Sequence, residues 1–259
     1  MTDIPLDDRG FTLGHGLFET VLWTDGALAH WDAHVERLER GCRALGLPTP
    51  DRAGFRNAAM VALADAGTPA RAAVRLSWSA GSGGRGLDAP VPLTPRLSVI
   101  ATAIDATPGP VTLATAGVRR NDRSPTSRLK TLSYLDNVLA RAEARAAGAE
   151  EALMLNTVGE IACAAAANVF WIRHDVVFTP DLDCGVLDGI MRREVIALCH
   201  RMGLRIEEVY ANPGRLAGAP MFITNSLVGV RVVASLDGQA LLTSSWVAAL
   251  AKAVKSGSK

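Results

Sequence analysis

Lysine is scarce in this sequence. Of its 27 basic residues only Lys130, Lys252, Lys255 and Lys259 are lysines, and the last three lie near the C-terminus. The other basic residues are arginines, whose guanidinium stays charged and is no nucleophile at neutral pH. An amine that can lose its proton is therefore present mid-chain only at Lys130. Most lysines are solvated surface residues, so this count alone does not assign it a role.

A strong charge of either sign is also lacking. The formal net charge is +1, which gives no indication of a nucleic-acid or membrane-surface partner. No apolar run approaches the roughly 18 residues of a membrane span, and the N-terminus lacks the basic start and apolar stretch of a secretory signal. We expect a cytoplasmic protein that acts on a small molecule.

The four cysteines are few and scattered, at Cys42, Cys163, Cys184 and Cys199. They form neither a CxxC pair nor the Cys/His spacing of a zinc site. We therefore expect reduced thiols and no metal.

The 259 residues, 49% of them apolar, are enough for one large or two smaller cores. In the first part we predict strands over 11–23 and 27–30, joined at the turn dipeptide Asp25-Gly26. Helices over about 32–45 and 52–66 and strands over 72–79 and 95–104 follow. A connector with proline and glycine at 106–110 suggests a domain boundary. We expect a smaller domain over 1–107 and a larger one over 108–259.

The second part is predicted to alternate irregularly between strands and helices. Strands are expected over 111–115, 152–156, 168–173, 204–209 and 221–224, and helices over 133–147, 190–202 and 244–254. In the first of these helices, helical spacing places Leu135, Val138, Leu139 and Ala142 on a core face. This irregular order favours mixed α/β sheets over a Rossmann sheet.

Several separated motifs share one resemblance. The run K-T-L-S-Y-L-D-N-V-L-A-R begins at Lys130, G-E-I-A at Gly159 and A-N-V-F-W at Ala167. Together with D-R-G-F-T-L-G-H-G-L-F-E-T-V from Asp8, they resemble the class IV pyridoxal-phosphate aminotransferase family over about residues 8–233. That family contains branched-chain and D-amino acid aminotransferases and aminodeoxychorismate lyases. The resemblance implies a two-domain α/β homodimer with its active site between the domains, the cofactor pyridoxal 5'-phosphate and a small amino substrate.

The resemblance also implies roles for individual residues. Lys130, expected in the second domain, would form the Schiff base, and Arg37 in H-V-E-R-L would grip the cofactor phosphate. The amides of Ile190 and Met191, at a helix start in L-D-G-I-M-R-R, would add to that anchor. The Thr224-Asn225-Ser226 turn is a further candidate for the anchor, with Asn225 and Ser226 assigned to the cofactor, although its hydroxyls could equally cap a turn.

Two further positions carry alternatives, and two others depart from the family pattern. Tyr134 would either reach the cofactor ring hydroxyl or simply pack. Arg85 in the loop GSGGRG is a candidate for a substrate carboxylate, although such loops are more often flexible turns. His15, where the family more often has aspartate, is interpreted as a turn residue. Ala80 stands where lyases often have arginine.

Cys163 is the main departure from the family pattern. It lies five residues before Asn168, where relatives carry the glutamate that keeps the cofactor's pyridine nitrogen protonated. A thiol has an ordinary pKa of about 8.5, against about 4.3 for glutamate, and is a less certain anion at neutral pH. A weakened electron sink favours a lyase whose product gains an aromatic ring.

We therefore predict a 4-amino-4-deoxychorismate lyase of folate biosynthesis, which releases pyruvate and 4-aminobenzoate. The alternatives are an aminotransferase for D-amino or branched-chain amino acids, and a non-catalytic relative that only binds ligands.

Overall fold

The computed structural model describes residues 4–106 and 109–257, and the chain forms two compact units. Unit 1 contains Met1–Ala106 and Leu129–Ser133, and unit 2 contains Thr107–Arg128 and Tyr134–Lys259. The expected boundary at 107–108 falls on residues outside the described ones. The segment around Lys130 lies in unit 1, whereas we expected the second domain to carry this lysine. The reason is that this segment pairs with a strand of unit 1.

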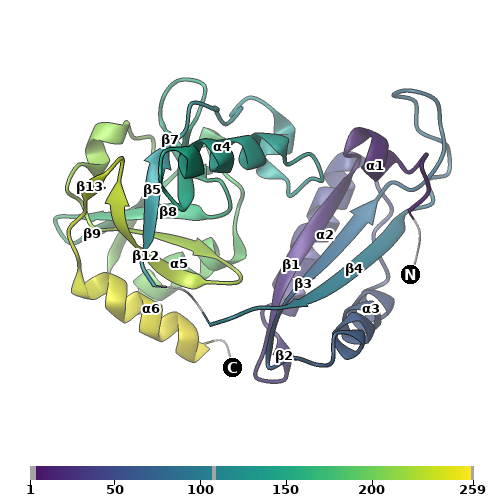
Figure 1. The fold of residues 1–259 in the computed structure, drawn as a ribbon, viewed down its shortest axis with the longest axis horizontal. Helices are drawn as coiled ribbons and strands as arrows, with labels where there is room; N and C mark the ends of the chain where they lie inside the picture. The colour runs from purple at the N-terminus through teal and green to yellow at the C-terminus, as the bar shows by residue number, and fades with distance from the viewer. Residues whose placement is uncertain (1–3, 107–108, 258–259) are drawn as a thin grey trace. The chain divides into compact units, whose positions relative to one another are not determined.

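Unit 1 is an antiparallel sheet covered by two helices (Figure 1). Its elements are α1 (Arg9–Leu13), β1 (Gly16–Thr24), β2 (Ala27–Leu28), α2 (Trp31–Leu45), α3 (Arg52–Asp65), β3 (Arg71–Ser79) and β4 (Arg96–Ala103), and the strand order is β2-β1-β3-β4. Val35 and Leu38 of α2 and Phe55 of α3 pack with Leu17 and Val74 of the sheet in one core. Asp25 and Gly26 both have positive φ, as the predicted turn requires.

The first predicted strand was wrong at its beginning. We expected extended chain from residue 11, but Arg9–Leu13 is the short helix α1. Asp8 caps it, because its side chain accepts a hydrogen bond from the Gly10 amide at 2.8 Å and another from Ser79 Oγ. The helix ends at Gly14, which has a left-handed conformation.

Unit 2 is built on a nine-stranded mixed sheet in the order β10-β9-β8-β11-β12-β5-β6-β7, with β13 paired to β12. The strands are β5 (Val111–Thr115), β6 (Glu151–Leu155), β7 (Ile161–Ala164), β8 (Asn168–Arg173), β9 (Val176–Pro180), β10 (Arg205–Val209), β11 (Met221–Asn225), β12 (Gly229–Leu236) and β13 (Gln239–Ala240). The helices are α4 (Leu135–Ala146), α5 (Ile190–Arg201) and α6 (Ser245–Gly257), with short 3₁₀ turns at Pro125–Arg128, Leu182–Cys184 and Pro213–Leu216.

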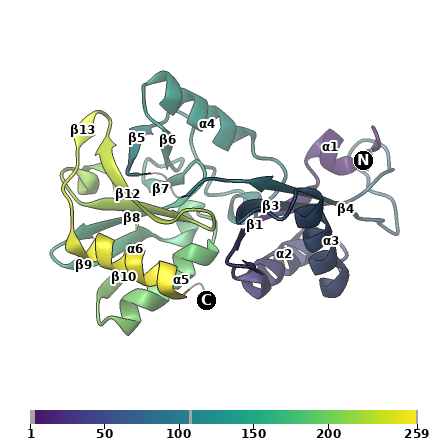
Figure 2. The same cartoon turned by 60° about the horizontal axis from the view of Figure 1, so that its bottom comes forward.

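Neighbouring residues of these strands enter different cores because side chains alternate between the faces of a sheet. Val169 and Trp171 belong to one core, while Phe170 and Ile172 pack against α5 and α6 in another. A third cluster joins Ala140 and Ala144 of α4 to β6 and β7. Figure 2 shows α5 and α6 on one side of β8 and β12, with α4 on the other.

Helix α4 presents the opposite face from the one predicted. Leu135, Val138 and Leu139 are 66%, 60% and 47% exposed, and Ala142 is also exposed. The buried face consists of Asn137, Ala140 and Ala144. Small side chains allow the helix to lie close to the sheet, and Asn137 satisfies its polar group there by donating a hydrogen bond to the Ala165 carbonyl.

Candidate functional site

Lys130 is held against the edge of β1. The Phe18 amide donates to the Lys130 carbonyl at 2.9 Å, and the Leu132 amide donates to the Gly16 carbonyl at 3.0 Å. These bonds extend the sheet beside β1 and place Lys130 Nζ 4.1 Å from the centroid of the Phe18 ring. An ammonium over an aromatic face is a cation–π contact. The backbone pairing therefore fixes the position of this lysine before any ligand binds.

Arg37 also approaches β1, at the residue after Phe18. Its Nε donates to Glu19 Oε1 at 2.8 Å and its Nη2 to Glu19 Oε2 at 2.5 Å. His34, one turn earlier on α2, forms a 2.7 Å hydrogen bond with the same Oε2. Burial alone would raise the pKa of Glu19, but Arg37 and His34 outweigh it and lower that pKa to about 2. The two predicted basic groups thus meet adjacent residues of one strand.

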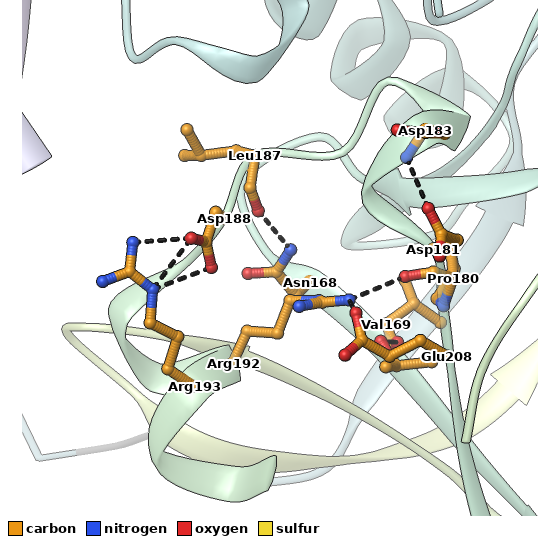
Figure 3. A network of polar contacts seen from close by, with 11 residues as sticks. Asn168, Val169, Pro180, Asp181, Asp183, Leu187, Asp188, Arg192, Arg193 and Glu208 are labelled. Atoms are coloured by element: carbon orange, nitrogen blue, oxygen red, sulfur yellow. Dashed lines mark hydrogen bonds and ion pairs between the residues drawn. The ribbon is translucent and has the colours of Figure 1, made fainter. Parts of the chain in front are cut away.

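The start of α5 is shaped by Asn168 of the A-N-V-F-W motif (Figure 3). Asn168 Nδ2 donates to the Leu187 carbonyl at 2.9 Å, and a Cβ added at Gly189 would lie 2.0 Å from Asn168 Oδ1. Gly189 is the N-cap of the helix and has no side chain to occupy its end, while Ile190 and Met191 are buried. Amides in the first turn of a helix point toward its N-terminus and suit an anion.

Two arginines in the first turn of α5 anchor this helix to neighbouring elements. Arg192 is buried, donates to the Pro180 carbonyl at 3.0 Å and pairs with Glu208 at 2.5 Å, and Arg193 pairs with Asp188 (Figure 3). These pairs employ the side chains in holding α5 to β9, β10 and the preceding loop. We therefore expect this turn to contribute its backbone amides, and not these arginine side chains, to the binding of an anion.

The turn after β11 lies beside this helix start. Thr224 pairs with Asn168 across the two strands, and its Oγ1 is buried with no hydrogen-bond partner among the described residues. Asn225 Oδ1 accepts hydrogen bonds from the amides of Leu227 and Val228, both at 3.0 Å. Its side chain therefore shapes the turn that presents Ser226. This hydroxyl can therefore still make a hydrogen bond to a water or to a bound polar group.

Cys163 lies on β7 in a nearly closed environment. It is 7% exposed and packs in the same cluster as Val186, three residues before Gly189. Burial raises the pKa of its thiol, the positive charge of Arg120 opposes this shift, and the charge of Glu151 adds to it. Cys163 is therefore a neutral thiol at pH 7.

Arg85 is exposed, and its loop is organised by a residue that the sequence analysis passed over. Arg9 is 4% exposed and donates hydrogen bonds to the carbonyls of Gly83, Gly86, Leu87 and Asp88, while its Nε donates to His15 Nδ1 at 3.3 Å. His15 is thus a structural residue of this turn. The D-R-G motif was the available signal for Arg9, but the carbonyls that it binds are more than seventy residues away.

Tyr134 occupies the N-cap of α4, where its carbonyl accepts a hydrogen bond from the Val138 amide at 3.1 Å. It belongs to unit 2, as do Cys163, Met191 and Ser226, whereas Lys130 is in unit 1. No three His, Cys, Asp or Glu side chains within 4–106 and 109–257 are grouped as metal ligands. No helix of the same described residues is long and apolar enough to cross a membrane.

Comparisons with known proteins agree with these features. The amino-transferase class IV family matches residues 16–236. The aminodeoxychorismate lyase of Vibrio harveyi is 30% identical over 242 residues, which cover 91% of this chain and 88% of that protein. The D-alanine aminotransferase of Bacillus licheniformis is 25% identical, with 92% and 84% covered.

Among solved structures, a putative 4-amino-4-deoxychorismate lyase from Legionella pneumophila matches with a TM-score of 0.92 at 26% identity, over 100% of this chain and 96% of that one. The predicted mixed α/β class IV fold is confirmed. The chain belongs to the class IV aminotransferases, a family of pyridoxal-phosphate-dependent enzymes.

Proposed function

We propose that this enzyme is a 4-amino-4-deoxychorismate lyase that carries pyridoxal 5'-phosphate and releases pyruvate and 4-aminobenzoate. The buried Cys163 thiol, at the position of the family's glutamate, is the observation that carries the choice of a lyase. The 30% identity to a lyase over nine tenths of the chain supports it. The same family contains aminotransferases, and the likeness to a D-alanine aminotransferase makes transamination the second candidate.

The residues present fit the cofactor. A phosphate suits the helix start at Gly189, where any larger residue would collide with Asn168, and it would supply the partner that Thr224 Oγ1 lacks. Ser226 and the amides of Ile190 and Met191 would complete this anchor in unit 2. Lys130 would hold the cofactor aldehyde and Arg37 would contribute to its phosphate. Tyr134 for the ring hydroxyl and Arg85 for a substrate carboxylate remain proposals from resemblance.

The cofactor supplies an electron sink for the carbon that bears the substrate amino group. Lys130 has the role of moving the proton at that carbon, because an amine can accept and return a proton whereas the chain's arginines cannot. Cys163 offers no fixed negative charge to the pyridine nitrogen, so the sink is weak. Loss of pyruvate with formation of an aromatic ring tolerates this weakness better than reversible transamination does.

The protein also exposes apolar side chains that fit a homodimer. Leu87 and Val91 of unit 1 are 87% and 96% exposed, and Leu135 and Val138 lie outward on α4. Apolar surface of this kind marks interaction sites, and most soluble oligomers are symmetric dimers. A dimer is therefore part of the proposal.

The test is to incubate the purified, cofactor-loaded protein with aminodeoxychorismate and follow both products. Equimolar 4-aminobenzoate and pyruvate are expected. Formation of pyridoxamine phosphate with D-alanine or branched-chain amino acids, and no 4-aminobenzoate, would assign the protein to the aminotransferases. Neither 4-aminobenzoate nor pyridoxamine phosphate would leave the non-catalytic alternative.

A further inference from the structure

A buried carboxylate in the middle of β1 has no role in the function proposed above. Glu19 is 1% exposed and lies on the face of the sheet that α2 covers. Its two oxygens receive three hydrogen bonds, two from Arg37 and one from His34. Burying a carboxylate is costly unless it is paired and hydrogen-bonded, so this arrangement holds all three side chains together.

The geometry fixes the plane of the Arg37 guanidinium. Oε1 takes Nε and Oε2 takes Nη2, so the carboxylate is bound along one edge of the planar fork. Rotation about the last bonds of the arginine side chain would break both hydrogen bonds. An exposed arginine, by contrast, samples many rotamers and loses that freedom when it binds an anion.

His34 fixes the carboxylate in turn. Burial lowers its pKa, an effect that the Glu19 hydrogen bond only partly opposes, so the ring is neutral at pH 7 and its Nδ1–H donates to Oε2. Its Nε2 is buried without a hydrogen-bond partner among the described residues. The hydrogen bond from Nδ1 to Glu19 therefore accounts for the burial of this histidine, although its Nε2 is left unsatisfied.

Charge alone does not explain the pairing. Glu19 is ionised and His34 is neutral, so the carboxylate cancels the charge of Arg37 instead of adding to its attraction for an anion. An anion anchor built on net charge would omit Glu19. The arrangement is suited to an anion contact that depends on the orientation of the Arg37 guanidinium.

We propose that Glu19 and His34 are positioning residues, which orient the Arg37 guanidinium for the phosphate of the cofactor. This inference rests on the proposed function, because it takes Arg37 as a phosphate contact. It predicts that Glu19 raises the affinity for ligands that carry the phosphate and does not affect the affinity for ligands that lack it.

The experiment compares the affinity of the apo-protein for pyridoxal 5'-phosphate and for pyridoxal, measured by fluorescence titration. Glu19→Gln keeps the side-chain shape but presents an amide N–H to donor groups, so Arg37 loses its two-point contact. We expect the affinity for pyridoxal 5'-phosphate to fall roughly tenfold or more, the range for a lost charged hydrogen bond, with the affinity for pyridoxal unchanged. In an Arg37→Ala background, Glu19→Gln should cause no further fall.

Two controls separate positioning from a general loss of structure. Glu39→Gln removes a half-buried carboxylate that binds the exposed Arg52 through the same two-point geometry, at 2.7 Å and 2.7 Å, and should leave both affinities unchanged. If Glu19→Gln does not fold, His34 provides the second pair of variants. His34→Asn retains a donor near the Nδ1 position and should keep the phosphate affinity, while His34→Ala should lose it several-fold.

The outcomes distinguish this inference from the proposed function. If the wild-type protein shows no preference for the phosphorylated ligand, the proposed function fails. If Arg37→Ala loses that preference but Glu19→Gln retains it, Glu19 does not position Arg37 and the inference is overturned. An equal loss of both ligands in Glu19→Gln would likewise reduce Glu19 to a structural residue.

Discussion

Single residues decide the chemistry available to this enzyme. At the position of Cys163 on β7, a glutamate would bring a negative charge and the thiol does not. Burial raises the pKa of the Cys163 thiol further above neutral pH. Arg120 brings positive charge to the same region, but its guanidinium is already bound to the Gly185 and Ser127 carbonyls and to Asn137. In the proposed function, the residue in this position therefore sets the charge near the pyridine nitrogen.

We predict that Cys163→Glu increases transamination more than lyase activity. A carboxylate would favour the protonated pyridine nitrogen, since an opposite charge within ~4–6 Å stabilises it. Single-turnover spectra with D- and L-amino acids, beside a 4-aminobenzoate assay, measure both activities. Cys163→Ser is the neutral control and should show no gain. An unstable Cys163→Glu protein without new pyridoxamine phosphate would instead mean that the glutamate is buried without a partner.

Lys130→Ala should abolish covalent attachment of the cofactor while leaving the fold intact. The lysine contributes its backbone carbonyl to β1, and alanine preserves that hydrogen bond. Borohydride reduction followed by peptide mapping identifies the modified residue, and Lys252→Ala on α6 serves as the control. Recovery of the label on another lysine would refute the assignment.

At the scale of elements, the α5 N-terminus depends on a close approach between Gly189 and Asn168. Gly189 has φ −70, a value that any residue adopts, so glycine is required here for space and not for backbone freedom. The matched position is Gly214, where an added Cβ meets nothing within 4 Å.

Gly189→Ala should therefore weaken cofactor binding at least tenfold and lower stability by about 1–3 kcal/mol, the usual cost of overpacking. Gly214→Ala should leave cofactor affinity unchanged. Equilibrium dialysis and urea unfolding measure the two effects. Equal behaviour of the two variants would show that the loop relaxes freely and that Asn168 does not define the site.

The pairing of β1 with α2 makes stability depend on pH. The pKa of His34 is lowered by burial, so its protonation favours the unfolded chain, and stability is lost as pH falls below the ordinary value of 6.5. The pKa of Glu19 is lowered from 4.5 to about 2, so its contribution is present above 4.5 and lost as pH falls toward 2.

We expect urea midpoints to decrease from pH 7.5 to 5 in the wild-type protein and to decrease less steeply in His34→Asn, where the lowered pKa of His15 still contributes. His174→Asn, at an exposed histidine, is the control and should keep the wild-type slope. A slope in His34→Asn as steep as that of the wild-type protein would place the titrating group elsewhere.

The whole molecule carries apolar surface that a monomer would leave in water. On α4, Leu135 and Val138 are more exposed than the alanines of the same helix that face the sheet. Their removal from water in a dimer would contribute about 25 cal/mol per Å² of apolar area.

We predict a homodimer at micromolar concentration, and dissociation on Leu135→Glu with Val138→Glu into a monomer that stays folded but melts at a lower temperature than the dimer. Light scattering coupled to gel filtration gives the mass. Arg145→Glu, in the last turn of the same helix, is the charge control. A wild-type monomer would contradict the prediction.

The sequence determined the local features, and tertiary structure decided which side chains meet. Asp25-Gly26, the boundaries of α5 and most strands follow from short-range preferences, so they were predictable within a few residues. Lys130, Arg37 and the turn at Gly189 were also found from motifs, though their roles stay predictions.

The rest depended on distant contacts. The spacing of apolar residues predicted an apolar face on α4, but the sheet contacts the alanine face of this helix. An apolar face indicates that a surface is covered and does not identify what covers it. Arg9 donates hydrogen bonds to carbonyls more than seventy residues away, and Glu19 contacts Arg37 only once α2 packs on β1. Such pairs carry no local signal, since the free energy that orders them comes from burial, which exists only in the folded chain.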